Sequence, residues 1–213
     1  MNSTDTRVRA VRRVGPDAVA LDIETPDGFD AQPGQFIKLS LDIGGERRSR
    51  FYTLSSPTVE DTFEITVGVE PGGDVGPYLA DLESGDTIEL AGPFGNAYYE
   101  DESHTTILAG GPGIGPAVGI AERTLDDGGE TAVIYRDDEP IHEQRLASLR
   151  EAGAFVSVLT EDENLTESVE SALTGTADEQ VFIYGFAEFL DAATDALQTV
   201  GGTPDRAKVE NFG

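Results

Sequence analysis

The sequence predicts a two-domain fold, an N-terminal antiparallel β-barrel (residues 1–100) followed by a C-terminal α/β domain with an open parallel sheet (residues 101–213). Three observations support this prediction. Residues 7 to about 98 contain short runs of alternating apolar and polar residues, separated by Gly, Pro and Asp turns. Beyond residue 100, apolar runs of strand length alternate with segments of period 3.6. The 213-residue chain is long enough for two domains, each with its own core.

The composition is extremely acidic, with 41 acidic against 14 basic residues and a formal net charge of −27. Acidity of this size often marks disorder, but the apolar residues are periodic, so we expect a folded protein. Adaptation to high salt explains the charge, because at about 1 M salt the screening length falls to roughly 3 Å and suppresses self-repulsion. The same charge argues against binding to nucleic acid or to anionic membranes, since a phosphate backbone is bound through clustered Lys and Arg.

Cysteine is absent, which excludes disulfides, cysteine-ligated iron-sulfur clusters and a cysteine nucleophile. The first six residues have no apolar core for a secretory signal, and the uncharged run 105–121 is too short and too rich in Gly and Pro to span a bilayer as a helix. We therefore expect a cytoplasmic protein without membrane insertion. His104 and His142 have no second ligand at a metal spacing, so we interpret both as surface or boundary residues and expect no metal site.

In the N-terminal half, alternating apolar residues predict strands around 19–23, 37–41 and 63–69. A short helix is expected at 75–82, directly after a Gly-Gly pair, and the chain then returns to a strand at 85–90. Strands with one buried and one polar face are typical of an antiparallel barrel.

In the C-terminal half, apolar runs predict strands at 105–109, 131–135, 155–159, 181–184 and 207–210. Apolar stripes predict helices at 114–125, 165–173 and 189–200. Asn164 and Glu167 form a capping-box pattern before the second helix, and Gly201 follows the third. Alternation of strands and helices predicts a parallel sheet covered on both faces.

The uncharged run contains a glycine-rich turn, Gly111-Pro112-Gly113-Ile114, between a strand and a helix. Glycines there let the backbone approach a pyrophosphate, and the start of a helix supplies N–H donors. The turn therefore indicates dinucleotide binding. The alternative is a tight turn that needs Gly only for its geometry.

An anion site is indicated at Arg50-Phe51-Tyr52-Thr53, in an expected strand. Basic residues average one in about fifteen along the chain, yet three arginines fall within positions 47–50. Arg47 and Arg48 can also be explained as a surface patch that balances neighbouring acids such as Glu46. For Arg50 we favour a ligand-binding role.

Several motifs occur together and in order, and together they resemble the ferredoxin-NADP reductase superfamily over nearly the whole chain. The motifs are Pro33-Gly34-Gln35-Phe36, Arg50-Phe51-Tyr52-Thr53, Gly73-Asp74-Val75-Gly76-Pro77-Tyr78-Leu79, Gly92-Pro93-Phe94-Gly95, the Gly110–Pro116 turn, Tyr184-Gly185-Phe186 and the ending Val209-Glu210-Asn211-Phe212-Gly213.

The resemblance implies a flavin site in the barrel. It implies Arg50 on a phosphate, Tyr52 packed on the isoalloxazine ring and the Thr53 hydroxyl near N5. Gly76 stands where the family usually has a hydroxyl residue that contacts the second phosphate. FAD is favoured over FMN, because both phosphate motifs belong to one extended cofactor. The expected flavin-binding residues are Arg50, Phe51, Tyr52, Thr53, Val67, Gly73, Asp74, Val75, Gly76 and Phe212.

The resemblance also implies that residues 209–213 return to the flavin, with Glu210 near the redox centre and Phe212 on the ring face opposite Tyr52. Thr53, Glu210 and Phe212 are therefore the expected catalytic residues, and nicotinamide must displace Phe212 before hydride passes. The alternative is an ordinary last strand with Phe212 in the core. Tyr184 stands where the family has a cysteine.

The donor is expected to be NADH rather than NADPH. Family members that use NADPH tend to have Ser-Arg after the third strand of this domain, whereas Thr160-Glu161 follows it here. An acidic residue suits a free ribose hydroxyl and repels a 2′-phosphate, although Arg136 could still bind a phosphate. The expected NAD(P)-binding residues are Gly111, Pro112, Gly113, Ile114, Arg136, Thr160, Glu161, Tyr184, Gly185 and Phe186.

The implied function is hydride transfer from NAD(P)H to FAD, followed by electron transfer to a separate acceptor such as a ferredoxin. A second interpretation is a flavin-bearing or nucleotide-sensing subunit of a larger complex, with little turnover alone. The purified protein is expected to be yellow and to bleach when NADH is added without air, whereas a colourless protein that fails to bind added FAD would rule out both interpretations.

Overall fold

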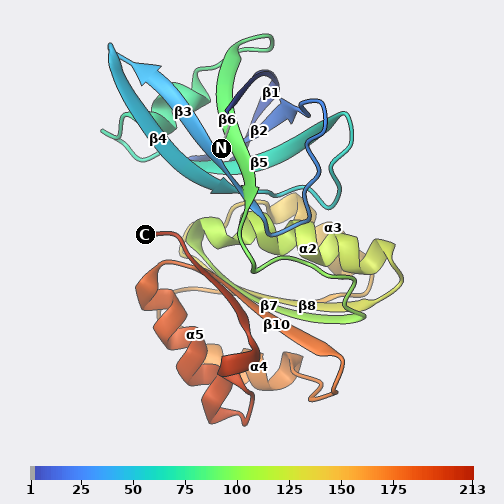
Figure 1. The fold of residues 1–213 in the computed structure, drawn as a ribbon. Helices are drawn as coiled ribbons and strands as arrows, with labels where there is room; N and C mark the ends of the chain where they lie inside the picture. The colour runs from blue at the N-terminus through green and yellow to red at the C-terminus, as the bar shows by residue number, and fades with distance from the viewer. Residues whose placement is uncertain (1–2) are drawn as a thin grey trace.

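The computed structural model describes residues 3–213, which form a β-barrel stacked on an α/β domain (Figure 1). The barrel is a six-stranded antiparallel sheet with the order β4-β3-β6-β1-β2-β5. An antiparallel bridge between Leu54 and Ile65 links the two edges, so the sheet curls toward closure. Its strands are β1 (Thr4–Gly15), β2 (Ala18–Glu24), β3 (Phe36–Ile43), β4 (Glu46–Thr53), β5 (Thr62–Gly68) and β6 (Thr87–Phe94).

The barrel core comes from the alternating residues that predicted its strands. Leu21, Leu39 and Ile65 are fully buried, as expected for the inward face of a pleated strand. The short helix α1 (Val75–Ala80) buries Val75 and Leu79 against this core and ends two residues before the predicted end at 82.

The C-terminal sheet is parallel throughout, with the order β11-β10-β7-β8-β9. All five predicted strands are present, and each end lies within two residues of its predicted position. Helices cover both faces, which confirms the predicted fold class. The strands are β7 (His104–Gly110), β8 (Glu130–Arg136), β9 (Phe155–Leu159), β10 (Glu179–Gly185) and β11 (Lys208–Asn211), and the helices are α2 (Ile114–Asp126), α3 (Glu143–Glu151), α4 (Leu165–Ala172) and α5 (Ala187–Thr199).

Helices α2 and α3 lie on the barrel side of this sheet, and α4 and α5 cover the opposite side (Figure 1). The sequence did not predict α3, because only Leu146 and Leu149 are buried in an otherwise polar segment. At the start of α4, the side chain of Asn164 accepts a hydrogen bond from Thr166 N at 3.0 Å. The reciprocal bond from Glu167 that a capping box requires does not occur among the hydrogen bonds of residues 3–213.

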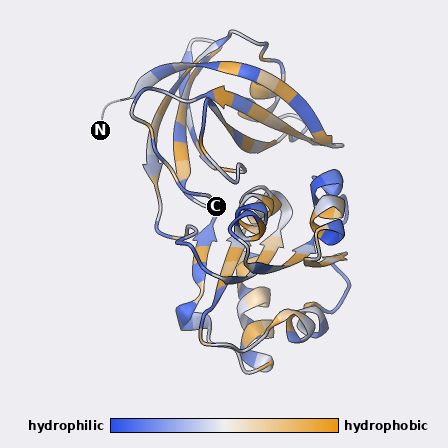
Figure 2. Cartoon of the chain, turned by 90° about the vertical axis from the view of Figure 1, so that its right-hand side faces the viewer, coloured by the Kyte–Doolittle hydropathy of each residue, from blue (hydrophilic) through white to orange (hydrophobic). Residues whose placement is uncertain are grey.

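Hydrophobic residues concentrate in the strands, as the colouring of the C-terminal sheet shows (Figure 2). Separate clusters fill the barrel and the two faces of the parallel sheet. Within the described residues, no helix is both long and apolar enough to cross a bilayer.

Candidate active site

A cleft of about 740 Å³ lies where the barrel meets the parallel sheet. It is bordered by β4, β5, the start of α1, the turn between β7 and α2, the loop before α3 and the C-terminal residues. Most of the predicted site residues line it, although they come from five separate segments. These are Arg50, Phe51, Tyr52, Thr53, Gly73, Asp74, Val75, Gly76, Gly111, Pro112, Phe186, Glu210 and Phe212.

On the barrel side, β4 supplies a cation and two aromatic rings. The only hydrogen bond from the Arg50 side chain to residues 3–213 goes to Ser49 O, at 2.9 Å, and no carboxylate of these residues lies within 4.0 Å. Phe51 is 63% exposed. Burial raises the pKa of Tyr52 to about 12, so its phenol is neutral. An unpaired guanidinium beside aromatic rings suits an aromatic ligand that carries phosphate.

Arg47 and Arg48 point elsewhere, as the surface-patch interpretation expects. Arg47 pairs with Asp42 and Glu89. Arg48 pairs with Glu46, and its Nε donates to Asp74 Oδ2 at 2.7 Å.

The turn Gly73–Gly76 is shaped by packing. The ion pair with Arg48 lowers the pKa of Asp74, so a carboxylate stands at the start of α1 with its charge already balanced. A Cβ atom at Gly76 would overlap the Gly68 carbonyl oxygen of β5. A hydroxyl side chain therefore has no room at this position.

Thr53 and Glu210 meet across the cleft although 157 positions separate them. The Thr53 hydroxyl donates to Glu210 Oε1 at 3.0 Å. The other oxygen, Glu210 Oε2, is buried and has no partner among residues 3–213. Burial raises the pKa of Glu210 to about 7, and the hydrogen bond from Thr53 opposes that shift in part. The carboxyl group can therefore hold or release a proton near neutral pH.

The glycine-rich turn borders the cleft with its first two residues and packs into the core with its last two. Gly111 adopts a left-handed conformation with φ 55° and lines the cleft beside Pro112. Gly113 is buried, and a Cβ atom there would overlap the Tyr184 carbonyl group. Ile114 is fully buried in the core. The first two residues of the predicted motif thus face a ligand site, and the last two serve packing.

The ring of Phe189 in α5 packs against the backbone at the ends of β7 and β10. A Cβ atom on Gly110 or on Gly185 would overlap its ring, so both backbones cross directly over the aromatic face. The Arg136 guanidinium stacks on the same ring at 5.2 Å from the centroid. Arg136 is thereby held near the end of β8, beside Gly110, its partner in the sheet.

Acidic residues gather at the ends of β8 and β9. The backbone N–H of Glu161 donates to Asp138 Oδ1 at 3.0 Å. The backbone N–H of Thr160 donates to Glu163 Oε2 at 2.8 Å. Neither Thr160 nor Glu161 borders the cleft.

Tyr184 is fully buried and does not border the cleft. Its hydroxyl donates to Ala97 O in the connection between the barrel and β7. Phe212 packs against the Tyr184 ring at 6.4 Å and meets Phe186, which is 49% exposed, edge to face at 6.3 Å. Phe212 therefore contributes both to the core beside Tyr184 and to the cleft wall.

Two predictions need correction. Val67 lies in the barrel core and its side chain does not face the cleft; its neighbours in β5, Thr66 and Gly68, do. His142 is only 4% exposed rather than at the surface. Among residues 3–213, no group of three or more His, Asp or Glu is placed to hold a metal ion.

The chain is similar to known FAD-binding oxidoreductases in sequence and in fold. Residues 5–99 match the family of oxidoreductase FAD-binding domains. The chain is 36% identical to the glycine betaine monooxygenase reductase subunit of Pseudomonas aeruginosa over 53% of its own length and 32% of that protein. It is 29% identical to the ferredoxin reductase component of the 3-ketosteroid-9-alpha-monooxygenase of Mycolicibacterium smegmatis, over 92% of this chain and 62% of that one. The chain thus spans from about a third to under two thirds of these relatives.

Among solved structures, the FAD/NAD-binding domain of the nitric oxide dioxygenase of Vibrio cholerae superposes with a TM-score of 0.84 at 23% identity, over 98% of both chains. A ferredoxin NADP⁺ reductase of Neisseria gonorrhoeae, with FAD and NADP bound, gives 0.78 at 21% identity over 100% of both chains. At these identities the likeness establishes the shared two-domain fold.

Proposed function

We propose that the chain belongs to the ferredoxin-NADP reductase superfamily of FAD/NAD oxidoreductases, and that it is an FAD-dependent NAD(P)H reductase that prefers NADH and passes electrons to a separate acceptor, such as a ferredoxin. The barrel, residues 1–100, is the proposed FAD domain. Residues 101–213 are the proposed NAD(P) domain. The relatives named as reductase components of oxygenase systems support an acceptor of this class.

The residues of the cleft fit FAD. Arg50 offers a cation without a carboxylate partner among residues 3–213, and Tyr52 and Phe51 offer aromatic faces beside it. The buried Oε2 of Glu210, which has no hydrogen-bond partner among residues 3–213, is the kind of polar atom that a ligand satisfies. A bound FAD would supply the redox chemistry, as hydride acceptor from the nicotinamide donor and as electron source for the acceptor.

The observation that carries the proposal is the hydrogen bond between Thr53 and Glu210. It joins β4 of the barrel to β11 of the parallel sheet, in the cleft that Arg50 and Gly111 also line. In this position the Glu210 carboxyl can hold a proton at Oε2 while Oε1 orients the Thr53 hydroxyl. Phe212 excludes water from the same wall of the cleft.

The acidic ends of β8 and β9 support the proposed preference for NADH. Asp138, Glu161 and Glu163 lie in hydrogen-bonded loops that follow these strands, where a parallel sheet of this type receives the adenosine ribose. Carboxylates there suit a ribose hydroxyl and repel a 2′-phosphate. Arg136 ends β8 opposite Leu159 of β9, and its guanidinium lies over the Phe189 ring.

The test is to purify the protein in molar salt, identify its flavin, and mix it anaerobically with NADH or NADPH. We expect a yellow protein that contains FAD and bleaches faster with NADH. Faster bleaching by NADPH would contradict the proposed donor preference. Bound FAD that neither donor reduces would favour a flavin-bearing subunit, and a colourless protein that does not take up added FAD would refute both flavin functions.

A further inference from the structure

The loop between β8 and α3 contacts the barrel through His142, which belongs to none of the predicted functional sites. Its Nε2 lies 2.8 Å from Thr66 Oγ1, and its backbone N–H donates to Val14 O at 2.9 Å. The residue adopts a left-handed conformation with φ 56°, which aims the buried ring at β5. Burial, with the nearby charges of Arg145 and Arg12, lowers the pKa of His142 to about 3, so the imidazole is neutral.

The hydroxyl that His142 contacts is shared. Thr66 Oγ1 also lies 2.7 Å from Ser55 Oγ, which makes a buried chain of three polar side chains. Helix α2 packs directly on this chain, because a Cβ atom at Gly115 would lie 2.7 Å from Ser55 Oγ and 2.8 Å from Thr66 Oγ1. Thr66 itself lines the cleft.

Arg145, on the first turn of α3, strengthens the same contact. Its Nη1 donates to Glu64 Oε1 and its Nη2 to Ser55 O, both at 2.8 Å. Its Nε donates to Glu122 of α2, also at 2.8 Å. Since Glu64 and Thr66 are two positions apart in β5, His142 and Arg145 grip one face of one strand.

We propose that His142 is a positioning residue: through Thr66 and Ser55 it fixes the start of α2 against β5 and so sets the separation between the nucleotide side and the barrel side of the cleft. The inference rests on the proposed function for its consequence. Helix α2 begins directly after the Gly111–Gly113 turn, and β5 presents Thr66 and Gly68 to the cleft. Hydride transfer requires the reacting atoms at about 3–3.5 Å, so a shift of roughly 1 Å between these elements matters.

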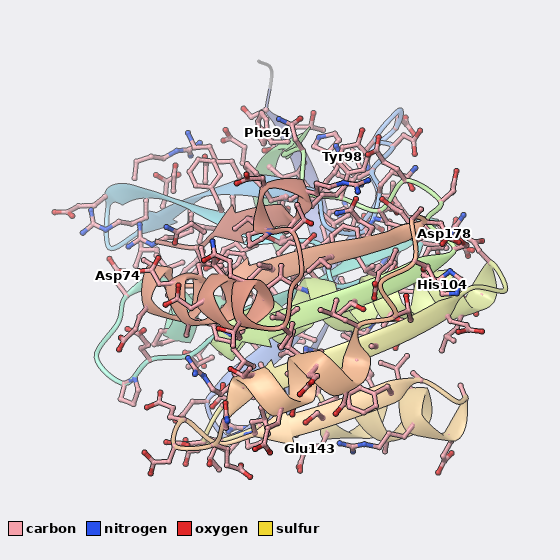
Figure 3. The ribbon with its side chains drawn as sticks, turned by 90° about the horizontal axis from the view of Figure 1, so that it is seen from below. Asp74, Phe94, Tyr98, His104, Glu143 and Asp178 are labelled. Atoms are coloured by element: carbon pink, nitrogen blue, oxygen red, sulfur yellow. The ribbon has the colours of Figure 1, made fainter. Side chains whose placement is uncertain are left out.

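The first experiment uses the protein without flavin or donor. Hydrogen exchange is measured at residues 62–68 and 113–121 in His142→Asn, His142→Gln and Thr66→Val. The Asn amide is too short to reach Thr66, whereas the Gln amide extends to about the place of Nε2. The matched control is His104→Asn, the other histidine, which pairs with Asp178 on the opposite side of the molecule from Asp74 (Figure 3).

We expect faster exchange in both segments for His142→Asn and Thr66→Val, and no further increase when the two substitutions are combined in a double variant. His142→Gln and the control should show protection close to wild type. Non-additivity is the sign of a shared contact. Unchanged exchange in His142→Asn, or additive effects in the double variant, would overturn the proposed coupling. Thr66→Val keeps the test decisive if His142→Asn does not fold, because valine is well suited to a strand.

The second experiment uses the FAD-loaded protein and NADH. We expect His142→Asn to slow flavin reduction at saturating NADH by at least about tenfold. It should also weaken the charge-transfer absorbance of the complex between the flavin and the nicotinamide. The Kd for NADH should stay within about twofold of wild type. His142→Gln should restore both signals. A loosened interface with an unchanged reduction rate would refute the positioning role. If no flavin binds, the proposed function fails, while the exchange data still decide whether His142 joins the two domains.

Discussion

Replacing Glu210 with Gln should remove a pH dependence from the stability of the apo-protein. The pKa of Glu210 is raised from 4.5 to about 7 by burial. A carboxyl group whose folded pKa exceeds its unfolded pKa stabilises the fold fully below pH 4.5, and this stability is lost as the pH rises through 7. A difference of about 2.5 pKa units corresponds to roughly 3 kcal/mol, at 1.36 kcal/mol per unit.

The assay is urea unfolding at constant molar salt, from pH 4.5 to 8. The free energy of unfolding of the wild type should fall by up to about 3 kcal/mol more than that of Glu210→Gln over this range. The control is Glu188→Gln, because Glu188 is exposed in the first turn of α5 and its variant should track the wild type. Thr53→Val should shift the fall to higher pH, because it removes the hydrogen bond that favours the ionised carboxyl. Parallel pH curves for the wild type and Glu210→Gln would refute the buried-carboxyl reasoning.

Three further changes test other parts of the cleft. Arg50→Gln should weaken FAD binding roughly tenfold to a hundredfold in a fluorescence titration, since a hydrogen bond to a charged group contributes about 1.5–3 kcal/mol; Arg47→Gln should bind as the wild type does, and equal losses would contradict the assignment. Gly76→Ser should destabilise the fold by about 1–3 kcal/mol in thermal unfolding, because its side chain collides with backbone; full stability would show that α1 can move. Tyr184→Phe should cost about 1–3 kcal/mol by leaving a buried carbonyl unpaired, without changing the Kd for FAD.

Periodicity predicted β2, β3, β5 and the five strands of the parallel sheet well, because side-chain alternation and strand length follow directly from burial. It predicted no separate strand for β1 and placed the end of β6 four residues too early. It failed at α3, where two leucines suffice because the helix is held by polar contacts instead. Arg145 makes four of them, to Glu64, Glu122 and Ser55 O. A helix anchored by hydrogen bonds to another domain leaves little apolar signal in its own sequence.

The positions of charged and aromatic site residues were easier to predict than the roles of residues that act through close packing. Arg50 and Glu210 both border the cleft as expected. The role of Gly76 was not visible, because it depends on a carbonyl group eight positions earlier in a different element. His142 was misjudged for the same reason: its partners, Val14 and Thr66, are more than seventy positions away.

The ring of Phe189 has a consequence for any attempt to re-engineer donor recognition. Gly110 and Gly185 cross the same aromatic face, and Arg136 stacks on it. A larger residue at Gly110 or Gly185 will therefore displace the Phe189 ring, which supports the other turn as well. A smaller residue at 189 will remove the support of both backbones at once. The size of residue 189 therefore controls the position of two loops together, although these loops are far apart in the sequence.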